Sequence, residues 1–296
     1  TIVWTDPKTA LQVRCQGIEY KDFPTIEWTV YFKNTGEVDT PILSDIMGVD
    51  LRLQRGAVGE FTLHHHVGSP ATISDYAPLE DVLKVNTTKH LGTYGGRPLN
   101  GSMPYFNVQW HGAGAVMAIG WPGQWAADFV RDASTGLQIR GGQELTKLKL
   151  HPGEEIRSSL TVIQFYQGDT IRSQNIWRRW MMEYNVPRPG GNKLQPQWNA
   201  FSSVQFAEMI MADEASQKRF IDRYLEEGIE IDYWWMDFGW YHYKPPNIRF
   251  EVDLERFPNG LRAITDYGRS KGVKSIVWFE PENVNAESQI YKEHPE

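Results

Sequence analysis

Carboxylates follow two short apolar runs in the last third of the chain. Asp237 ends the first run, and Glu280 and Glu282 end the second. A tryptophan accompanies each group, at Trp240 and Trp278. Glycoside cleavage uses a pair of facing carboxylates, and tryptophan faces stack on sugar rings. These residue types therefore predict a carbohydrate-binding pocket.

Spacing alone leaves three roles open for these carboxylates. They could be the nucleophile and the acid/base, they could cap a helix or bind a loop, or they could hold sugar hydroxyls. Trp278 is either a sugar platform or part of the packing, because it and Val277 point to opposite faces of a strand. Trp240 follows a glycine, which favours the rim of a pocket over a core.

The two apolar runs, 231–236 and 273–279, flank the segment 259–272, which has helical spacing of its apolar residues. A short strand at 197–201 and a helix at 212–227 precede them, which gives the order β-α-β-α-β. Strands connected in this way are parallel, and α/β barrels place their sites at the carboxyl ends of such strands. A barrel is favoured over a dinucleotide fold because no Gly-x-Gly-x-x-Gly turn follows a strand. Only three of its eight strands are expected here, so the (β/α)₈ TIM barrel is incomplete.

The N-terminal half has short β-type runs about ten residues apart, separated by turn residues, which predicts an antiparallel β-sandwich. A helix capped by Asp169 or Thr170 follows, and the Pro- and Gly-rich stretch 187–191 ends it. We therefore expect a β-sandwich domain at 1–168, a connecting helix and linker at 169–191, and the start of the barrel at 192–296.

Composition narrows the classes of function. The chain has 296 residues and a net charge of -7, which argues against nucleic acid as a partner. The chain contains no run of 18 apolar residues, so no membrane span is expected. The single cysteine excludes an internal disulfide. The chain begins at Thr1 without a methionine, and we expect both ends to be cut. The sequence does not fix a cellular compartment.

Three consecutive histidines, His64, His65 and His66, invite a metal interpretation. Consecutive side chains of a strand alternate between faces, so at most two of them share an ion, and no acidic residue lies next to them. The sequence therefore predicts no metal site.

Several spaced motifs occur along the chain. They are Leu63–His66 with Gly68–Ser69, Asp75–Pro78, Pro104–Asn107, Gly120–Trp125, His151–Glu154, the helix Trp177–Pro189, Phe257–Leu261, Ser270–Gly272, Val277–Glu282 and Ile290–Pro295. By these motifs the chain resembles glycoside hydrolase family 36, the α-galactosidase group, along nearly its whole length.

The resemblance implies a supersandwich domain, a catalytic barrel and a retaining exo-acting enzyme that cleaves terminal α-galactosides without a metal or cofactor. The family's nucleophile and acid/base are aspartates on later strands, so we expect no catalytic residue in this chain and no activity from it alone. By this resemblance Asp237 binds substrate hydroxyls, Trp278 lines the sugar pocket and Glu280 sits beside it. In some oligomeric members the loop matching Gly68–Pro78 reaches a neighbouring subunit's pocket, which makes Asp75 a weaker substrate-binding residue and is compatible with a homo-oligomer.

The chain departs from the family at one position. The family usually has two adjacent aspartates before Gly-Trp on the second strand, and here the pair is Asp237-Phe238. A phenyl ring accepts no hydrogen bond from a hydroxyl, and an unpaired buried hydroxyl costs about 1–3 kcal/mol. We therefore expect altered selectivity, toward galactose with a modified or missing polar group.

Two other functions stay open at this stage. One is a non-catalytic carbohydrate-binding protein, and the other is a transglycosylase similar to raffinose synthase. All three readings share an α-galactoside oligosaccharide or glycoconjugate as the partner.

Overall fold

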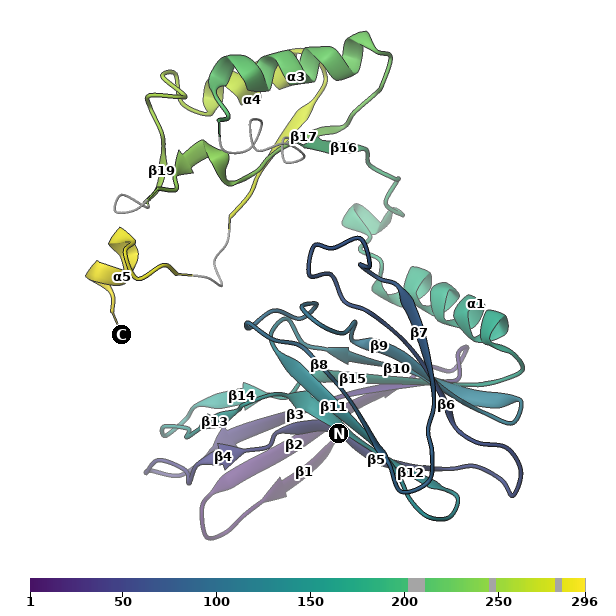
Figure 1. Ribbon diagram of the computed structural model, residues 1–296. Helices are drawn as coiled ribbons and strands as arrows, with labels where there is room; N and C mark the ends of the chain where they lie inside the picture. The colour runs from purple at the N-terminus through teal and green to yellow at the C-terminus, as the bar shows by residue number, and fades with distance from the viewer. Residues whose placement is uncertain (202–210, 245–248, 280–283, 296) are drawn as a thin grey trace. The chain divides into compact units, whose positions relative to one another are not determined.

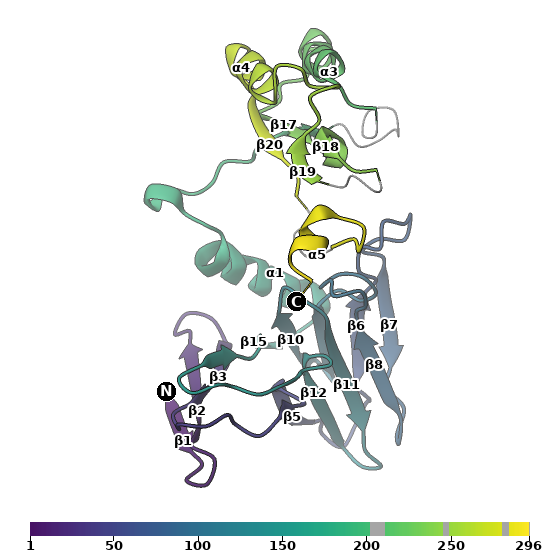
Figure 2. The same cartoon turned by 90° about the vertical axis from the view of Figure 1, so that its left-hand side faces the viewer.

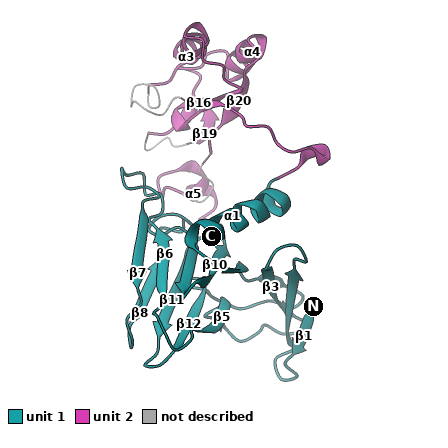
Figure 3. Ribbon diagram, turned by 90° about the vertical axis from the view of Figure 1, so that its right-hand side faces the viewer, with its two compact units in different colours: residues 1–186 teal, residues 187–296 magenta. Residues whose placement is uncertain are grey.

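The computed structural model describes residues 1–296 except 202–210, 245–248, 280–283 and 296. The chain forms two compact units, Thr1–Val186 and Pro187–Glu296, which Figure 3 colours separately. Each unit has its own apolar core, and each is described by itself.

Unit 1 consists mostly of antiparallel strands (Figure 1). The strands are β1 (Ile2–Thr5), β2 (Leu11–Glu19), β3 (Thr25–Asn34), β4 (Leu43–Ser44), β5 (Met47–Gln54), β6 (Thr62–His66), β7 (Pro78–Val82), β8 (Thr88–Gly92), β9 (Tyr105–Trp110), β10 (Ala113–Gly120), β11 (Trp125–Arg131), β12 (Gly136–Gln143), β13 (Lys147–Leu148), β14 (Glu155–Arg157) and β15 (Leu160–Gln167). The larger sheet has the order β1-β2-β3-β15-β10-β9-β6-β7, with β14 also paired to β3. The smaller sheet has the order β5-β12-β11-β8, and β13 pairs with β4.

The inner faces of the two sheets share one core. Along β11, Trp125, Phe129 and Arg131 are buried, whereas Val130 between them is exposed. This period of two is what a strand with one covered face requires. The larger sheet contributes Met117 and its neighbours to the same cluster.

One helix, α1 (Thr170–Trp180), packs on the outer face of the larger sheet against β10 and β15 (Figures 1 and 2). Asp169 caps it by accepting a hydrogen bond from the Arg172 backbone N–H at 2.8 Å. Trp180 is buried together with Ala118 and Val162 of the sheet. A π-turn, η1 (Met181–Asn185), and a short 3-10 turn, η2 (Pro189–Gly191), follow. The predicted cap by Asp169 is confirmed.

Unit 2 is a short parallel β/α region. Its strands β16 (Asn199–Phe201), β17 (Tyr233–Met236) and β20 (Lys274–Val277) form one parallel sheet in that order. The helices α3 (Glu214–Glu226) and α4 (Arg262–Ser270) pack against each other and lie on one side of this sheet (Figure 2). The remaining elements are η3 (Phe238–Trp240), β18 (Tyr241–His242), β19 (Arg249–Val252) and α5 (Gln289–Glu293).

Local signals in the sequence explain the ends of these elements. Asp213 and Ser216 form a reciprocal capping box at the start of α3, and Gly228 follows its end with a φ of 74°. Ile221 of α3 and Ile264 of α4 are fully buried against the strands. The predicted order of parallel strands joined by helices is confirmed.

Candidate functional site

Two adjacent strand ends bring the first predicted site residues together. Met236 at the end of β17 is in register with Val277 at the end of β20, and the Trp278 N–H donates to the Met236 carbonyl at 3.0 Å. Asp237 and Trp278 therefore continue neighbouring parallel strands at the same edge of the sheet. This is the edge where open and closed α/β folds bind their ligands.

Asp237 starts the short turn η3. One of its carboxylate oxygens accepts a hydrogen bond from the Phe238 N–H at 2.7 Å, and the side chain is half-buried. The residue thus caps its own turn, as one of the three interpretations of the sequence foresaw. A carboxylate accepts up to about four hydrogen bonds, so this capping bond leaves acceptor capacity for a ligand.

Phe238 belongs to an aromatic cluster at the same edge. Its ring centre lies 5.2 Å from that of Tyr243, edge to face, and 6.2 Å from that of Trp278. Aromatic pairs at these separations attract each other. The position after Asp237 is therefore an apolar wall, half-buried among aromatic rings.

Trp240 does not occupy a pocket rim. Its side chain is 4% exposed, and its indole N–H donates to the Trp278 carbonyl at 3.0 Å. Its ring packs edge to face against Tyr241 and Phe279. The sequence-based expectation of a rim position is wrong because the segment after the glycine folds back onto the end of β20. Trp240 thereby ties together the two strand ends that carry Asp237 and Trp278.

Two predicted residues, Glu280 and Glu282, lie outside the described residues.

Asp75 organises its own loop in unit 1. Its carboxylate accepts from the Ser69 hydroxyl at 2.8 Å and from the Thr72 N–H at 2.8 Å. The backbone bond from Thr72, followed by the Ser69 hydroxyl, lowers the pKa of Asp75 below its ordinary value. The large hydrophobic side chains of this loop, those of Ile73 and Tyr76, are exposed.

The first two histidines of β6, His64 and His65, have separate hydrogen-bonding partners. His65 is buried and bonds the Asp81 carboxylate at 2.8 Å, whereas His64 lies 3.0 Å from the side-chain oxygen of Gln109 on the other face. Burial, together with the neighbouring histidines, lowers the pKa of His66. Within the described part of the chain, no three His, Cys, Asp or Glu side chains converge as metal ligands would.

None of the helices described is both long and apolar enough to cross a membrane.

The segment from Asp253 to Arg256 supports the site, and the sequence reading missed it. The Asp253 carboxylate bonds the Arg256 guanidinium at 2.8 Å, and the Asp253 N–H donates to the Trp240 carbonyl at 3.1 Å. Burial opposes ionisation of Asp253, but Arg256, with His242 behind it, outweighs burial and lowers the pKa of Asp253. The signal that could have revealed this pair is the spacing of three between an acid and a base directly before Phe257-Pro258.

Replacing Asp253 is expected to make the stability of unit 2 less sensitive to acid. Because the folded pKa lies below the unfolded value of about 3.9, the stabilisation is complete above about pH 4 and is lost as the pH falls through the folded pKa. We expect Asp253→Asn to lower the free energy of unfolding by about 2 kcal/mol at pH 7, and by much less at pH 2. Urea unfolding at both pH values measures this. The exposed Asp266→Asn is the control, and an equal loss at both pH values would contradict the prediction.

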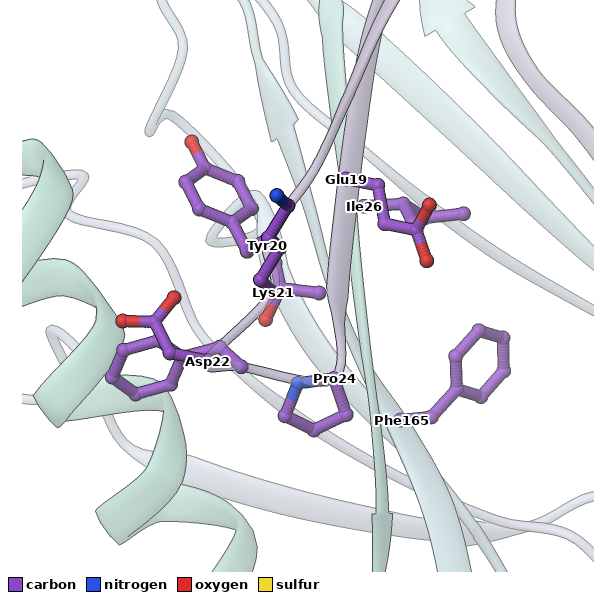
Figure 4. A pocket seen from close by; sticks show the side chains of 9 residues that line it. Glu19, Tyr20, Lys21, Asp22, Pro24, Ile26 and Phe165 are labelled. Atoms are coloured by element: carbon purple, nitrogen blue, oxygen red, sulfur yellow. The ribbon is translucent and has the colours of Figure 1, made fainter.

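A hollow lies in unit 1, at the turn between β2 and β3 (Figure 4). It is open, has a volume of about 530 Å³, and Tyr20, Asp22 and Phe165 are among its lining residues. Burial and the charge of Glu27 raise the pKa of Tyr20 to about 12. The Tyr184 hydroxyl donates a hydrogen bond to the Asp22 carboxylate and lies 2.8 and 2.9 Å from its two oxygens. This bond holds the turn against the segment after α1.

Known proteins match both units of the chain. The Melibiase family model matches residues 203–296. α-Galactosidase Mel36A of Lactobacillus acidophilus is 26% identical over 155 residues, which is 51% of this chain and 20% of that protein. α-Galactosidase 2 of Hypocrea jecorina is 36% identical over 204 residues, which is 58% of this chain and 26% of that protein. The chain is related to the α-galactosidases of glycoside hydrolase family 36.

Solved structures of this family agree with the fold. The crystal structure of the family 36 α-galactosidase AgaA from Geobacillus stearothermophilus matches 99% of this chain with a TM-score of 0.78 at 16% identity. The match covers 41% of AgaA and corresponds to the N-terminal part of such enzymes. Variants of AgaA have been crystallised with raffinose and with stachyose. The chain thus spans well under half the length of the relatives it matches.

Proposed function

We propose that the complete protein containing this chain is a retaining exo-α-glycosidase that acts on terminal galactose or a modified galactose. The observation that carries the proposal is the placement of Asp237 and Trp278 on neighbouring parallel strand ends, in a chain related to α-galactosidases. Residues 1–168 are the supersandwich domain, 169–191 the connection, and 192–296 the first three strands of the (β/α)₈ barrel. The raffinose and stachyose complexes of AgaA support an α-galactosyl oligosaccharide as the substrate.

In this proposal the chain holds the sugar rather than attacking it. The Asp237 carboxylate accepts hydrogen bonds from sugar hydroxyls, and Trp278 lines the same pocket. Trp240 acts from the core by fixing the two strand ends, since its indole holds the Trp278 carbonyl. Asp75 contributes through its loop to a neighbouring subunit. The two reacting aspartates belong to later barrel strands, so residues 1–296 alone are inactive.

Phe238 sets the selectivity of this pocket. Its ring lies against Tyr243 and Trp278, so a sugar hydroxyl directed at this wall would have no acceptor. Such a hydroxyl loses about 1–3 kcal/mol relative to one that is paired. The favoured sugar therefore has a modified or missing polar group at this place.

Kinetics of the complete protein and its Phe238→Asp variant test both parts of the proposal. We expect the unmodified protein to cleave at least one aryl glycoside among α-galactoside, its 6-deoxy analogue and its 2-acetamido analogue, with retention. The new carboxylate in Phe238→Asp should favour plain galactoside over the better analogue by about tenfold in kcat/KM relative to the unmodified protein, because about 1.4 kcal/mol corresponds to a factor of ten. Phe165→Asp, the same change at an exposed position of β15, should leave the ratio unchanged.

The outcomes separate the two parts. If the complete protein cleaves none of the three glycosides, the proposed enzyme is rejected, and sugar binding without cleavage would identify a binding protein instead. Transfer to added sugar acceptors in place of hydrolysis would identify a transglycosylase. If the unmodified protein cleaves all three at comparable rates, the role of Phe238 is rejected while the glycosidase stands.

A further inference from the structure

The turn after β17 is held through its backbone. Three consecutive carbonyl oxygens, those of Gly239, Trp240 and Tyr241, accept hydrogen bonds from one short segment near Phe257. Arg256 donates to the first and, at 2.9 Å, to the third, and the Asp253 N–H donates to the second at 3.1 Å. The carbonyls of this turn are therefore bound one after another by a segment that lies more than ten residues further along the chain.

The Arg256 side chain is itself fixed. Its Nε donates to the Asp253 carboxylate at 2.8 Å, and its Nη1 also donates to the Ala212 carbonyl, just before α3, at 3.0 Å. The guanidinium lies 5.4 Å from the centre of the Tyr243 ring and 5.6 Å from that of Phe257. With 21% of its surface exposed, this side chain is locked between the turn, the helix start and two aromatic rings.

Only arginine makes this set of contacts. Its planar guanidinium presents five donors in a fixed fork, which suits one carboxylate and several carbonyls at once. The ammonium of lysine is a compact group on a flexible stem and has three donors. A lysine at position 256 keeps the charge beside Asp253 but cannot reach all the carbonyls that the fork reaches.

We propose that Arg256 is a positioning residue that fixes the turn after β17 and so sets the direction of the Asp237 carboxylate and the Phe238 ring. Asp237 caps the turn η3, and Phe238 is its first residue, so any shift of the turn moves both side chains. Arg256 acts through the backbone of Gly239 and Tyr241 and does not touch the sugar. The link to substrate binding rests on the proposed function, whereas the link to the backbone does not.

Arg256→Lys in the complete protein tests the proposal with two independent readouts. Amide hydrogen exchange should rise at least tenfold at residues 238–242 and stay unchanged in β20, which has no bond to Arg256. On the aryl glycoside that the unmodified protein cleaves best, KM should rise about tenfold while kcat stays within about threefold. This split is expected because a displaced substrate-holding group weakens ground state and transition state alike.

Two controls separate positioning from general stability. Ile264→Val removes one methyl group from the core of unit 2 and lowers the unfolding temperature, but it leaves every hydrogen bond between Arg256 and the turn in place. Arg269→Lys makes the same chemical change at an exposed site of α4. Neither should raise KM or the exchange at residues 238–242.

The proposal is overturned if Arg256→Lys leaves the exchange of residues 238–242 unchanged, or if Ile264→Val reproduces its KM. If the unmodified protein cleaves no glycoside, the proposed function fails, and the exchange measurement still decides whether Arg256 holds the turn.

Discussion

Replacing Asp237 by asparagine is expected to lower kcat/KM of the complete protein on its best aryl glycoside by at least 100-fold. Asparagine nearly preserves the shape but replaces one acceptor oxygen by a donor and removes the charge. Hydrogen bonds to a charged group contribute about 1.5–3 kcal/mol each, so the loss of two such bonds to sugar hydroxyls gives this magnitude. The loss should appear mainly as a higher KM.

The same strand offers a matched control for this experiment. Asp232 precedes β17, and its carboxylate accepts from the Trp198 N–H at 2.8 Å, at the opposite end of the strand from Asp237. Asp232→Asn makes the same chemical change and should alter kcat/KM by less than about threefold, since binding sites lie at the carboxyl ends of such strands. Near-normal activity of Asp237→Asn, or an equal loss in both variants, would remove Asp237 from the site. A loss confined to kcat would make Asp237 a reacting group instead.

Replacing Arg131 by methionine is expected to destabilise unit 1 by about 3–5 kcal/mol. The Arg131 side chain is completely buried, and it bonds the Glu60 carboxylate at 2.7 and 3.1 Å. It also donates to the carbonyls of Asp132, Ser134 and Gly136 in the turn that leads into β12. Methionine fills most of the space but removes the bidentate partner of the Glu60 carboxylate and the side-chain donor to the carbonyls of Asp132 and Ser134.

Unfolding of unit 1 in urea, followed by circular dichroism, measures this effect. Arg140→Met is the control, because Arg140 pairs with Asp50 at 3.2 Å while both side chains are about half exposed, and such surface pairs contribute about 0–1 kcal/mol. Adding Glu60→Gln to Arg131→Met should recover part of the loss, since in Arg131→Met alone the half-buried Glu60 carboxylate keeps only Arg55 as a cationic partner, at 3.3 Å. A loss below about 1 kcal/mol for Arg131→Met would show that the buried pair is not needed for stability.

The sequence by itself determined the three parallel strands and the two intervening helices of unit 2, and one pairing within its site. Apolar spacing and the stop at Gly228 act between residues close together in the chain, so their effect can be read locally. The rule that helix-connected strands run parallel then brought Asp237 and Trp278 to one sheet edge. The absence of an acceptor at Phe238 also follows from residue type alone.

Only the tertiary structure decided which side chains support that edge. Trp240 is buried because its indole reaches the Trp278 carbonyl, 38 residues further along. Arg256 donates hydrogen bonds to the turn after β17. Arg131 bonds Glu60, which lies 71 residues away in the sequence. A hydrogen bond across such distances depends on how elements pack, and neither periodicity nor residue type encodes that packing locally. The sequence therefore identified the groups that could bind a sugar, whereas the fold alone assigned the residues that hold them in place.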